Sequence, residues 1–205
     1  FTFQAMSYLI DVYRGDVGIE RNWLRLCLFK SFFPQLIAGP IVRYRDIAGA
    51  LSERTHSLPE AAYGIRRFIA GFAQKVIIAN TLGEIADKLF SLPEPQLSTP
   101  LAWIAAAAYT FQIYFDFCGY SNMAIGIARI FGFHFLENFN YPYISQSITD
   151  FWRRWHISLS TWFRDYLYIS LGGNRVIKWR WYFNLSITFI ISGLWHGSNW
   201  TYIIW

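Results

Sequence analysis

The sequence predicts an all-α protein, a multi-pass integral membrane helical bundle that also contains re-entrant or interfacial helices. Hydrophobic residues make up 54% of the 205 positions and charged residues only 15%, against about 25% charged residues in an ordinary soluble domain. The windows 95–115 and 181–205 contain no Asp, Glu, Lys or Arg, and each reaches the roughly 20 residues that cross a hydrocarbon core. We therefore expect a spanning helix at each window. The alternative is a large aromatic soluble core, although such cores are built from shorter apolar runs.

Three segments with helical character are expected in the first ninety residues. Residues 1–13 indicate the end of an apolar helix closed by "RGDVG", and "LCLFKSFFPQLIAGPIVRY" follows with Pro34, Gly39 and Pro40 inside it. Because proline removes a backbone donor and disfavours helix at the preceding residue, this stretch predicts a broken or re-entrant helix. Residues 58–90 carry too many charges for a simple span and indicate an interfacial or partly buried helix pair.

The middle of the chain contains an exposed loop and a candidate packing helix. "SLPEPQLSTP" at 91–100 is rich in Pro and Ser and predicts the loop. Asp116 directly follows the window 95–115, where an interfacial carboxylate and a functional one are both compatible with the pattern. Small residues then recur and would let membrane helices approach closely; they are Gly119, Ser121, Ala124, Gly126 and Ala128.

The net charge of +5 does not indicate a nucleic-acid partner. The basic residues lie beside apolar segments and form neither a free basic tail nor a recognised nucleic-acid motif, so loops facing the cytoplasm are their expected place. Cys27 and Cys118 lack CxxC spacing and a companion histidine pattern. We interpret both as packing residues and predict no metal site.

Two histidines lie in tryptophan-rich segments. Treated as one helix, residues 147–168 place charged groups on one arc and aromatic rings on the other, with His156 near the edge of the aromatic arc and roughly opposite Arg153 and Arg154. Burial there disfavours the imidazolium form, and a neutral ring can accept a proton or a hydrogen bond. A histidine that only anchors an interfacial helix is an equally compatible interpretation.

His196 lies inside the window 181–205, where an ionisable group indicates function by default. Gly193 and Gly197 leave room for another backbone or a substrate beside the ring, and burial among Trp195 and Trp200 would keep the imidazole neutral. A packed, hydrogen-bonded structural histidine is the alternative.

A basic cluster surrounds these segments, with only Asp150 and Asp165 to balance it. Lipid headgroups would explain it, and so would the phosphates of an activated carrier, because guanidinium geometry suits phosphate oxygens. "LGGN" at 171–174 lacks the spacing of a phosphate-binding P-loop, and neither HExxH nor GxSxG is present. The cluster consists of Arg153, Arg154, Arg164, Arg175, Lys178 and Arg180.

Five tracts resemble the membrane-bound O-acyltransferase family, in its bacterial branch of alginate O-acetyltransferases and teichoic acid D-alanyl transferases. They are "MSYLIDVYRG", "FFPQLIAGPIVRY", "FDFCGYSNMAIGIARIFGF", "ENFNYPYISQSITDFWRRWHISLSTWFRDYLYISLGGNR" and "GLWHG". The resemblance implies a multi-pass protein of the bacterial inner membrane with a tunnel, through which an acyl group passes from a cytoplasmic thioester to an acceptor on the far side. Residues 1–205 would then be a partial catalytic domain, and we expect further transmembrane helices beyond the C-terminus and before the N-terminus.

The resemblance also implies roles for particular residues. It makes His196 of "GLWHG" catalytic and maps the second polar position onto His156. We assign binding of the donor to Trp152, Arg153, Arg154, Trp155, Arg164 and Trp195. Asn122 and Ser170 stand where the branch usually has Asp and Pro, and Asn122 removes a carboxylate that could pair with an arginine.

The implied donor is acetyl-CoA or an acyl-carrier thioester, with no bound cofactor. The implied partners are membrane lipids, the donor or its carrier protein, and a periplasmic acetyltransferase or acceptor. Two alternatives stay open, D-alanyl transfer to teichoic acid and a non-enzymatic transporter or scaffold subunit whose histidines line a pore.

Overall fold

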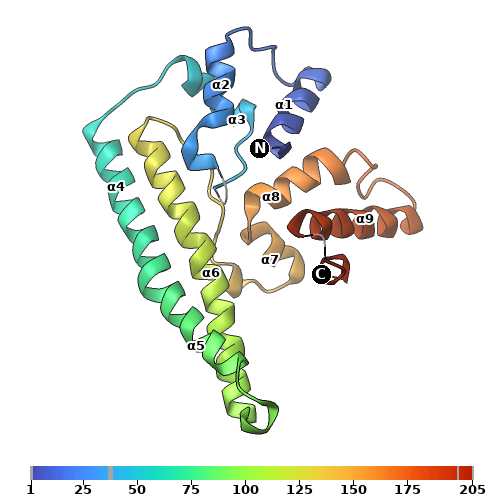
Figure 1. Ribbon diagram of the computed structural model, residues 1–205. Coiled ribbons are helices and arrows are strands. Elements are labelled where there is room, and N and C mark those ends of the chain that lie inside the picture. Colours follow the sequence, from blue (N-terminus) through green and yellow to red (C-terminus); the bar gives the residue numbers. More distant parts are fainter. Residues whose placement is uncertain (1, 37–38, 198, 205) are drawn as a thin grey trace.

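The computed structural model describes residues 2–36, 39–197 and 199–204, and all regular structure in these ranges is helical (Figure 1). This confirms the all-α class. In the same ranges, no helix combines the length and the apolar character that a membrane crossing requires. The predicted end of the second window, Trp205, and the first residue of the predicted N-terminal helix, Phe1, lie outside the described residues.

The N-terminal part is a group of short helices around an aromatic core. It comprises α1 (Thr2–Arg14), α2 (Trp23–Ser31), the 3₁₀ turn η1 (Phe33–Gln35) and α3 (Tyr44–Ser52). The predicted break is confirmed, because α2 ends at Ser31 just before Pro34 and the chain leaves η1 in an extended conformation at Leu36. Phe29, Tyr44 and Ile47 are buried in the core that α2 and α3 share with the C-terminal part of α6.

Two long helical rods form the lower arm of the molecule (Figure 1). The first rod joins α4 (Leu58–Ala73), the π-helical segment η2 (Gln74–Ala79) and α5 (Asn80–Phe90). The second is α6 (Thr99–Ile130), reached through an exposed loop with the short turn η3 (Glu94–Gln96), as predicted. The predicted helix pair over 58–90 was wrong, because the backbone passes through η2 without leaving the helical region.

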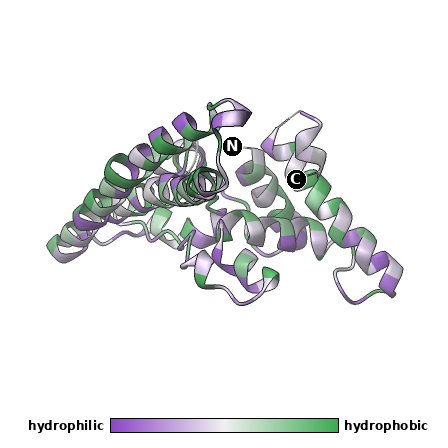
Figure 2. Cartoon of the chain, turned by 90° about the horizontal axis from the view of Figure 1, so that it is seen from below, coloured by the Kyte–Doolittle hydropathy of each residue, from purple (hydrophilic) through white to green (hydrophobic). Residues whose placement is uncertain are grey.

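Small residues set the spacing of the two rods. A Cβ atom on Gly64 would lie 2.5 Å from the carbonyl oxygen of Gly126, and Gly71 faces Gly119 in the same way. The prediction that small residues permit close packing here is confirmed. The rods also expose large apolar side chains, among them Ile69, Ile77 and Trp103, and surfaces of this kind meet lipid or another protein. Figure 2 marks the hydrophobic residues of the chain in green.

Asp116 lies in the middle of α6. The helix predicted over 95–115 therefore continues past Asp116, and the carboxylate does not mark its end. This carboxylate forms an ion pair with the ammonium group of Lys75 on η2, so the charge is balanced between the rods. The packing role is also wrong for Cys27, whose side chain is exposed, whereas Cys118 is buried as expected.

The C-terminal part contains η4 (Pro142–Ile144), α7 (Ile148–Arg154), α8 (Ile157–Trp162), the π-helical segment η5 (Phe163–Tyr168), α9 (Lys178–His196) and α10 (Thr201–Ile204). A single helix over 147–168 is therefore wrong, because the chain breaks at Trp155 and at His156, whose φ of 42° is left-handed. The second window is divided as well, since α9 ends at His196 and Gly197 is extended.

Candidate active site

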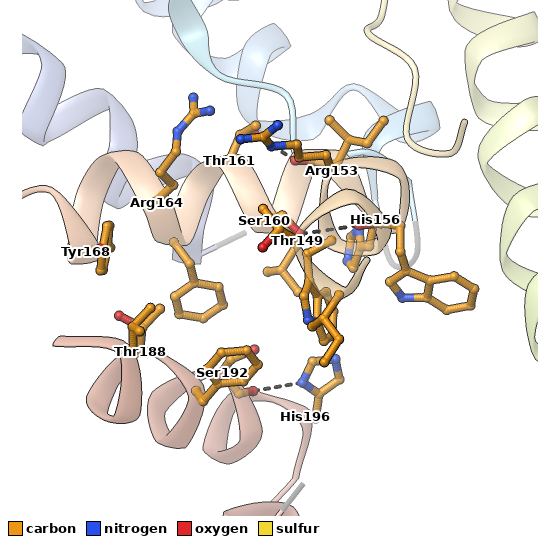
Figure 3. A pocket seen from close by; sticks show the side chains of 18 residues that line it. Thr149, Arg153, His156, Ser160, Thr161, Arg164, Tyr168, Thr188, Ser192 and His196 are labelled. Carbon is orange, nitrogen blue, oxygen red and sulfur yellow. Dashed lines mark hydrogen bonds between the residues drawn. The ribbon is translucent and has the colours of Figure 1, made fainter. Parts of the chain in front are cut away.

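A cavity of about 660 Å³ lies between α9 and the segment formed by α7, α8 and η5 (Figure 3). It brings together six of the side chains expected from the sequence: Trp152, Arg153, Trp155, His156, Arg164 and His196. Hydroxyl groups that the sequence analysis did not single out add to the wall, on Ser160, Thr161 and Tyr168 from one side and on Thr188 and Ser192 from α9. Most of the remaining lining is apolar, so the cavity offers a few polar groups in a hydrophobic setting, as small-molecule sites do.

His156 occupies the break between α7 and α8. Its side chain is buried, and its ring packs edge-on against Phe117 of α6 with 4.6 Å between the centroids. The Nδ1 atom lies 3.1 Å from Oδ1 of Asn138, a residue of the loop that follows α6. A left-handed conformation is costly for a residue with a Cβ, so this contact explains part of how the turn persists.

The same contact determines the tautomer of His156. Oδ1 of Asn138 also accepts from the backbone N–H of Ser158 at 3.1 Å, and because a backbone N–H can only donate, this atom must be the amide oxygen. Nδ1 of His156 therefore carries the hydrogen. In the neutral ring the lone pair is then on Nε2, which makes Nε2 a proton acceptor.

His196 is the last residue of α9 and is exposed, so the predicted burial among Trp195 and Trp200 is wrong. Trp200 itself is 79% exposed, while the Trp195 ring packs edge-on against His196 at 4.8 Å. Nδ1 of His196 lies 2.7 Å from the carbonyl oxygen of Ser192. Because a carbonyl can only accept, Nδ1 again carries the hydrogen, and the neutral ring has its lone pair on Nε2.

The two glycines beside His196 have different surroundings. Gly193 is buried within α9. A Cβ atom on Gly197 would collide with the ring of Tyr202, so the space beside this glycine is occupied by an aromatic side chain of the same chain and not by another backbone.

The predicted donor-binding residues do not all reach the cavity. Arg153 and Arg164 line it, and Figure 3 shows their guanidinium groups on the side of α8 that faces away from α9. Arg154 lies outside the cavity lining and donates through Nε to both carboxylate oxygens of Asp150, at 2.9 and 3.0 Å. Trp195 also lies outside the lining, stacked on Phe3 of α1 at 5.4 Å.

Asp165 balances the positive charge on the other face of α8, where a smaller cavity of about 210 Å³ lies. Its carboxylate accepts from Nη1 of Arg43 at 2.7 Å and from Nε of Arg164 at 2.6 Å. Burial alone would raise the pKa of Asp165, but these two hydrogen bonds outweigh it and hold the pKa below its usual value.

Asn122 and Ser170, the two residues that depart from the branch pattern, both form side-chain hydrogen bonds. Oδ1 of Asn122 accepts from Nη2 of Arg67 at 2.9 Å, so the arginine that a carboxylate could pair with is Arg67. Oγ of Ser170 accepts from Nη2 of Arg14 at 2.8 Å and donates to the carbonyl oxygen of Tyr166, also at 2.8 Å. This ties the turn after η5 to α1.

Comparison with known proteins decides the family. The family model of the membrane-bound O-acyltransferases matches residues 22–205. The chain belongs to the membrane-bound O-acyltransferase family. It is therefore a membrane protein, and the resemblance seen in the sequence motifs is confirmed.

Relatives within this O-acyltransferase family differ in what their names say they modify. Over 205 residues the chain is 57% identical to the probable alginate O-acetylase AlgI of Azotobacter vinelandii, covering all of the chain and 41% of that protein. It is 40% identical to the peptidoglycan O-acetyltransferase of Helicobacter pylori, covering the whole chain and 44% of that protein. It is 32% identical to the teichoic acid D-alanyltransferase of Bacillus subtilis, covering the whole chain and 54% of that protein. The chain thus spans about two fifths of the length of the alginate relative.

Proposed function

We propose that the whole protein is a multi-pass O-acetyltransferase of the bacterial inner membrane, which moves an acetyl group from a cytoplasmic thioester towards hydroxyl groups of an exopolysaccharide such as alginate. One observation carries this proposal: two histidines, each anchored through Nδ1, line one cavity in a chain 57% identical to a probable alginate O-acetylase. Acetyl-CoA or an acyl-carrier thioester is the donor. Membrane lipids and a periplasmic acetyltransferase or acceptor protein are the partners.

His196 acts as the general base in this proposal. Nε2 takes the proton from the acceptor hydroxyl as its oxygen attacks the thioester carbonyl carbon. The tetrahedral intermediate then collapses, the C–S bond breaks, and the imidazolium returns the proton to the leaving thiolate. General-base action of this kind contributes about 10²- to 10⁴-fold in rate.

His156 has an orienting role. Its Nδ1–H is directed at Asn138, so the neutral ring presents to a ligand only an acceptor, Nε2. Polarising a carbonyl oxygen would need a donor. The geometry therefore supports an interaction with a substrate hydroxyl or amide hydrogen, and not a role in which His156 polarises the thioester carbonyl.

The arginines suit the anionic end of the donor. Arg153 and Arg164 take part in the lining of a cavity whose volume is in the range of small-molecule sites, about 300–1,000 Å³. Their guanidinium groups form its outer rim, on the side of α8 that faces away from α9. Guanidinium groups bind phosphate oxygens through paired hydrogen bonds. We assign phosphates of the donor to this rim and the thioester to the space between His156 and His196.

Replacement of the base tests the proposal. In the full-length protein in inner-membrane vesicles supplied with acetyl-CoA, H196A is expected to lower acetyl transfer by about 10²- to 10⁴-fold with unchanged membrane content. The control is H56A, which removes an exposed imidazole far along the chain from the cavity. Wild-type rates from H196A would reject the assignment. Transport without thioester cleavage would favour a transporter, and use of a D-alanyl carrier thioester in preference to acetyl-CoA would favour teichoic acid modification.

A further inference from the structure

We propose that Asn138 is the positioning residue of His156: it holds the ring in the cavity wall and directs the Nδ1–H away from the substrate, so that Nε2 is the only atom through which this imidazole exchanges protons. The catalytic part of this inference rests on the proposed function, whereas its structural part can be tested alone. Asn138 itself does not line the cavity, so it acts through His156.

Asn138 is held rigidly enough to do this. Its side chain is fully buried, and its Nδ2 donates to Oγ of Ser121 on α6 at 3.0 Å. Its own carbonyl oxygen accepts from the N–H of Ile157, the first residue of α8, at 2.9 Å. Asn138 thereby connects the second rod to the start of α8, and the ring of His156 lies at that junction.

The amide oxygen of Asn138 gathers three donors. They are Nδ1 of His156 at 3.1 Å, the N–H of Ser158 at 3.1 Å and Oγ of Ser158 at 2.9 Å. An amide oxygen accepts hydrogen bonds but takes up no proton under these conditions, so no proton passes from the ring through Asn138 to Ser158. The contact is therefore an anchor and not a relay.

An amide differs from a carboxylate at this position in its charge. An aspartate would place a negative charge at hydrogen-bond distance from the ring and favour the imidazolium form. The neutral amide fixes the orientation without that effect, which keeps Nε2 available as an acceptor. Aspartate matches Asn138 in size, but it would lose the Nδ2 donor to Oγ of Ser121 and would add a negative charge beside the ring.

Other titratable groups around His156 come from several elements. His196 on α9 faces the same cavity, as do Arg153 on α7 and both Arg164 and Tyr168 on η5. From α6 the ring meets Phe117, and from α9 it meets Trp195 at 6.5 Å, neither of which titrates. The cationic and neutral groups in this set do not favour a positive charge on His156. A carboxylate introduced at position 138 would favour that charge and would raise the pKa of the ring.

The pH titration of the His156 ring gives the first test. In N138D of the full-length protein, the ring-¹⁵N signals of His156 are expected to change from the neutral to the imidazolium form at a pH about 1–3 units higher than in the wild type, because a carboxylate beside the ring favours the charged form. The matched control is N140D, the same change at an exposed residue of the same loop, whose titration is expected to match that of the wild type. A merely structural Asn138 would reduce the amount of folded protein and leave the titration of His156 in place. Superimposed titration curves for N138D and wild type overturn the proposal.

A second test needs neither activity nor a change at position 138. Ring-¹⁵N-histidine labelling of the full-length wild-type protein in lipid gives signals for its histidines, four of which lie in residues 1–205, and the signal lost in H156Q belongs to His156. Near pH 7 this ring is expected to be neutral with its hydrogen on Nδ1. A hydrogen on Nε2 contradicts the inference. Absence of acetyl transfer in the wild type, by contrast, rejects the proposed function and leaves this measurement decisive for the positioning role.

Discussion

Gly71 of α4 and Gly119 of α6 face each other backbone to backbone, so that a Cβ atom on Gly71 would lie 2.5 Å from the carbonyl oxygen of Gly119, and one on Gly119 would lie 2.7 Å from that of Gly71. Gly64 and Gly126 repeat this relationship seven residues away. The antiparallel rods therefore touch along two pairs of glycines. Close approach of this kind is how helices gain packing contacts in membranes.

The glycine contact predicts a large effect of one methyl group. G119A is expected to lower the free energy of unfolding by about 1–3 kcal/mol, because the obstructing atoms are backbone and cannot move aside. Thermal unfolding in detergent measures the change. G49A is the matched control, since nothing lies within 4 Å of a Cβ at this exposed helical position and alanine favours helix there. Equal melting temperatures for G119A and wild type would refute the packing argument.

The carboxylate of Asp165 predicts a pH-dependent contribution to stability. Its pKa is lowered in the folded protein, so its contribution is present above the pKa of the unfolded chain and is lost as the pH falls through the lower, folded value. At pH 7, D165N is expected to lower the free energy of unfolding by about 1–3 kcal/mol, because the buried guanidinium of Arg43 loses a charged acceptor.

Unfolding of D165N and wild type compared between pH 7 and pH 3 measures this contribution. The difference should shrink below about pH 4, where the wild-type carboxylate also becomes protonated. D87N removes an exposed carboxylate of α5 and is expected to change stability by less than about 0.5 kcal/mol. A D165N effect that stayed constant down to pH 3 would contradict an ionic origin.

Arg153 and Arg154 are adjacent in sequence but differ in position, so their variants should differ in kind. Arg153 lines the cavity, and R153A is expected to raise the KM for acetyl-CoA by about tenfold or more with little change in kcat, through loss of a charged hydrogen bond. R154A breaks the contact with Asp150 and should act on stability. Initial rates and melting temperatures of both variants separate the two effects, and equal increases in KM would place both arginines at the donor.

Trp195 contacts both histidine rings, at 6.5 Å from His156 and 4.8 Å from His196, without lining the cavity. W195A is therefore expected to lower kcat by about tenfold through misplacement of the rings, with KM for acetyl-CoA nearly unchanged. W195F should retain most of the rate. W179A, at an exposed tryptophan of the same helix, serves as control. A rise in the KM of W195A with unchanged kcat would contradict this prediction and support the role in donor binding that the sequence analysis gave Trp195.

Local sequence signals succeeded where the cause of structure is local. Pro34 ends a helix because it lacks a donor, and the small residues of α6 face a neighbouring helix because only they permit the close approach. The family motifs likewise placed His156 and His196 in the same region of the molecule. Trp152, Arg153, Trp155 and Arg164 share the cavity with them.

The same signals failed where a distant residue decides the conformation. Helical periodicity over 147–168 assumes a continuous helix, but His156 adopts a left-handed conformation next to Asn138, which lies 18 residues earlier in the chain. Asn138 carried no motif of its own in the sequence. Its role became visible only through the atoms that surround its side chain.

Composition and motifs by themselves determined that this chain is helical, apolar and a member of an acyltransferase family, because these properties depend on residue type and local order. The tertiary structure decided the rest: where the helices break, which of two neighbouring arginines enters the cavity, and which nitrogen of each imidazole carries its hydrogen. Those outcomes depend on contacts between segments far apart in the chain. The tautomer of an imidazole, for example, is determined by the partner of its ring nitrogen, such as a carbonyl or amide oxygen within about 3 Å.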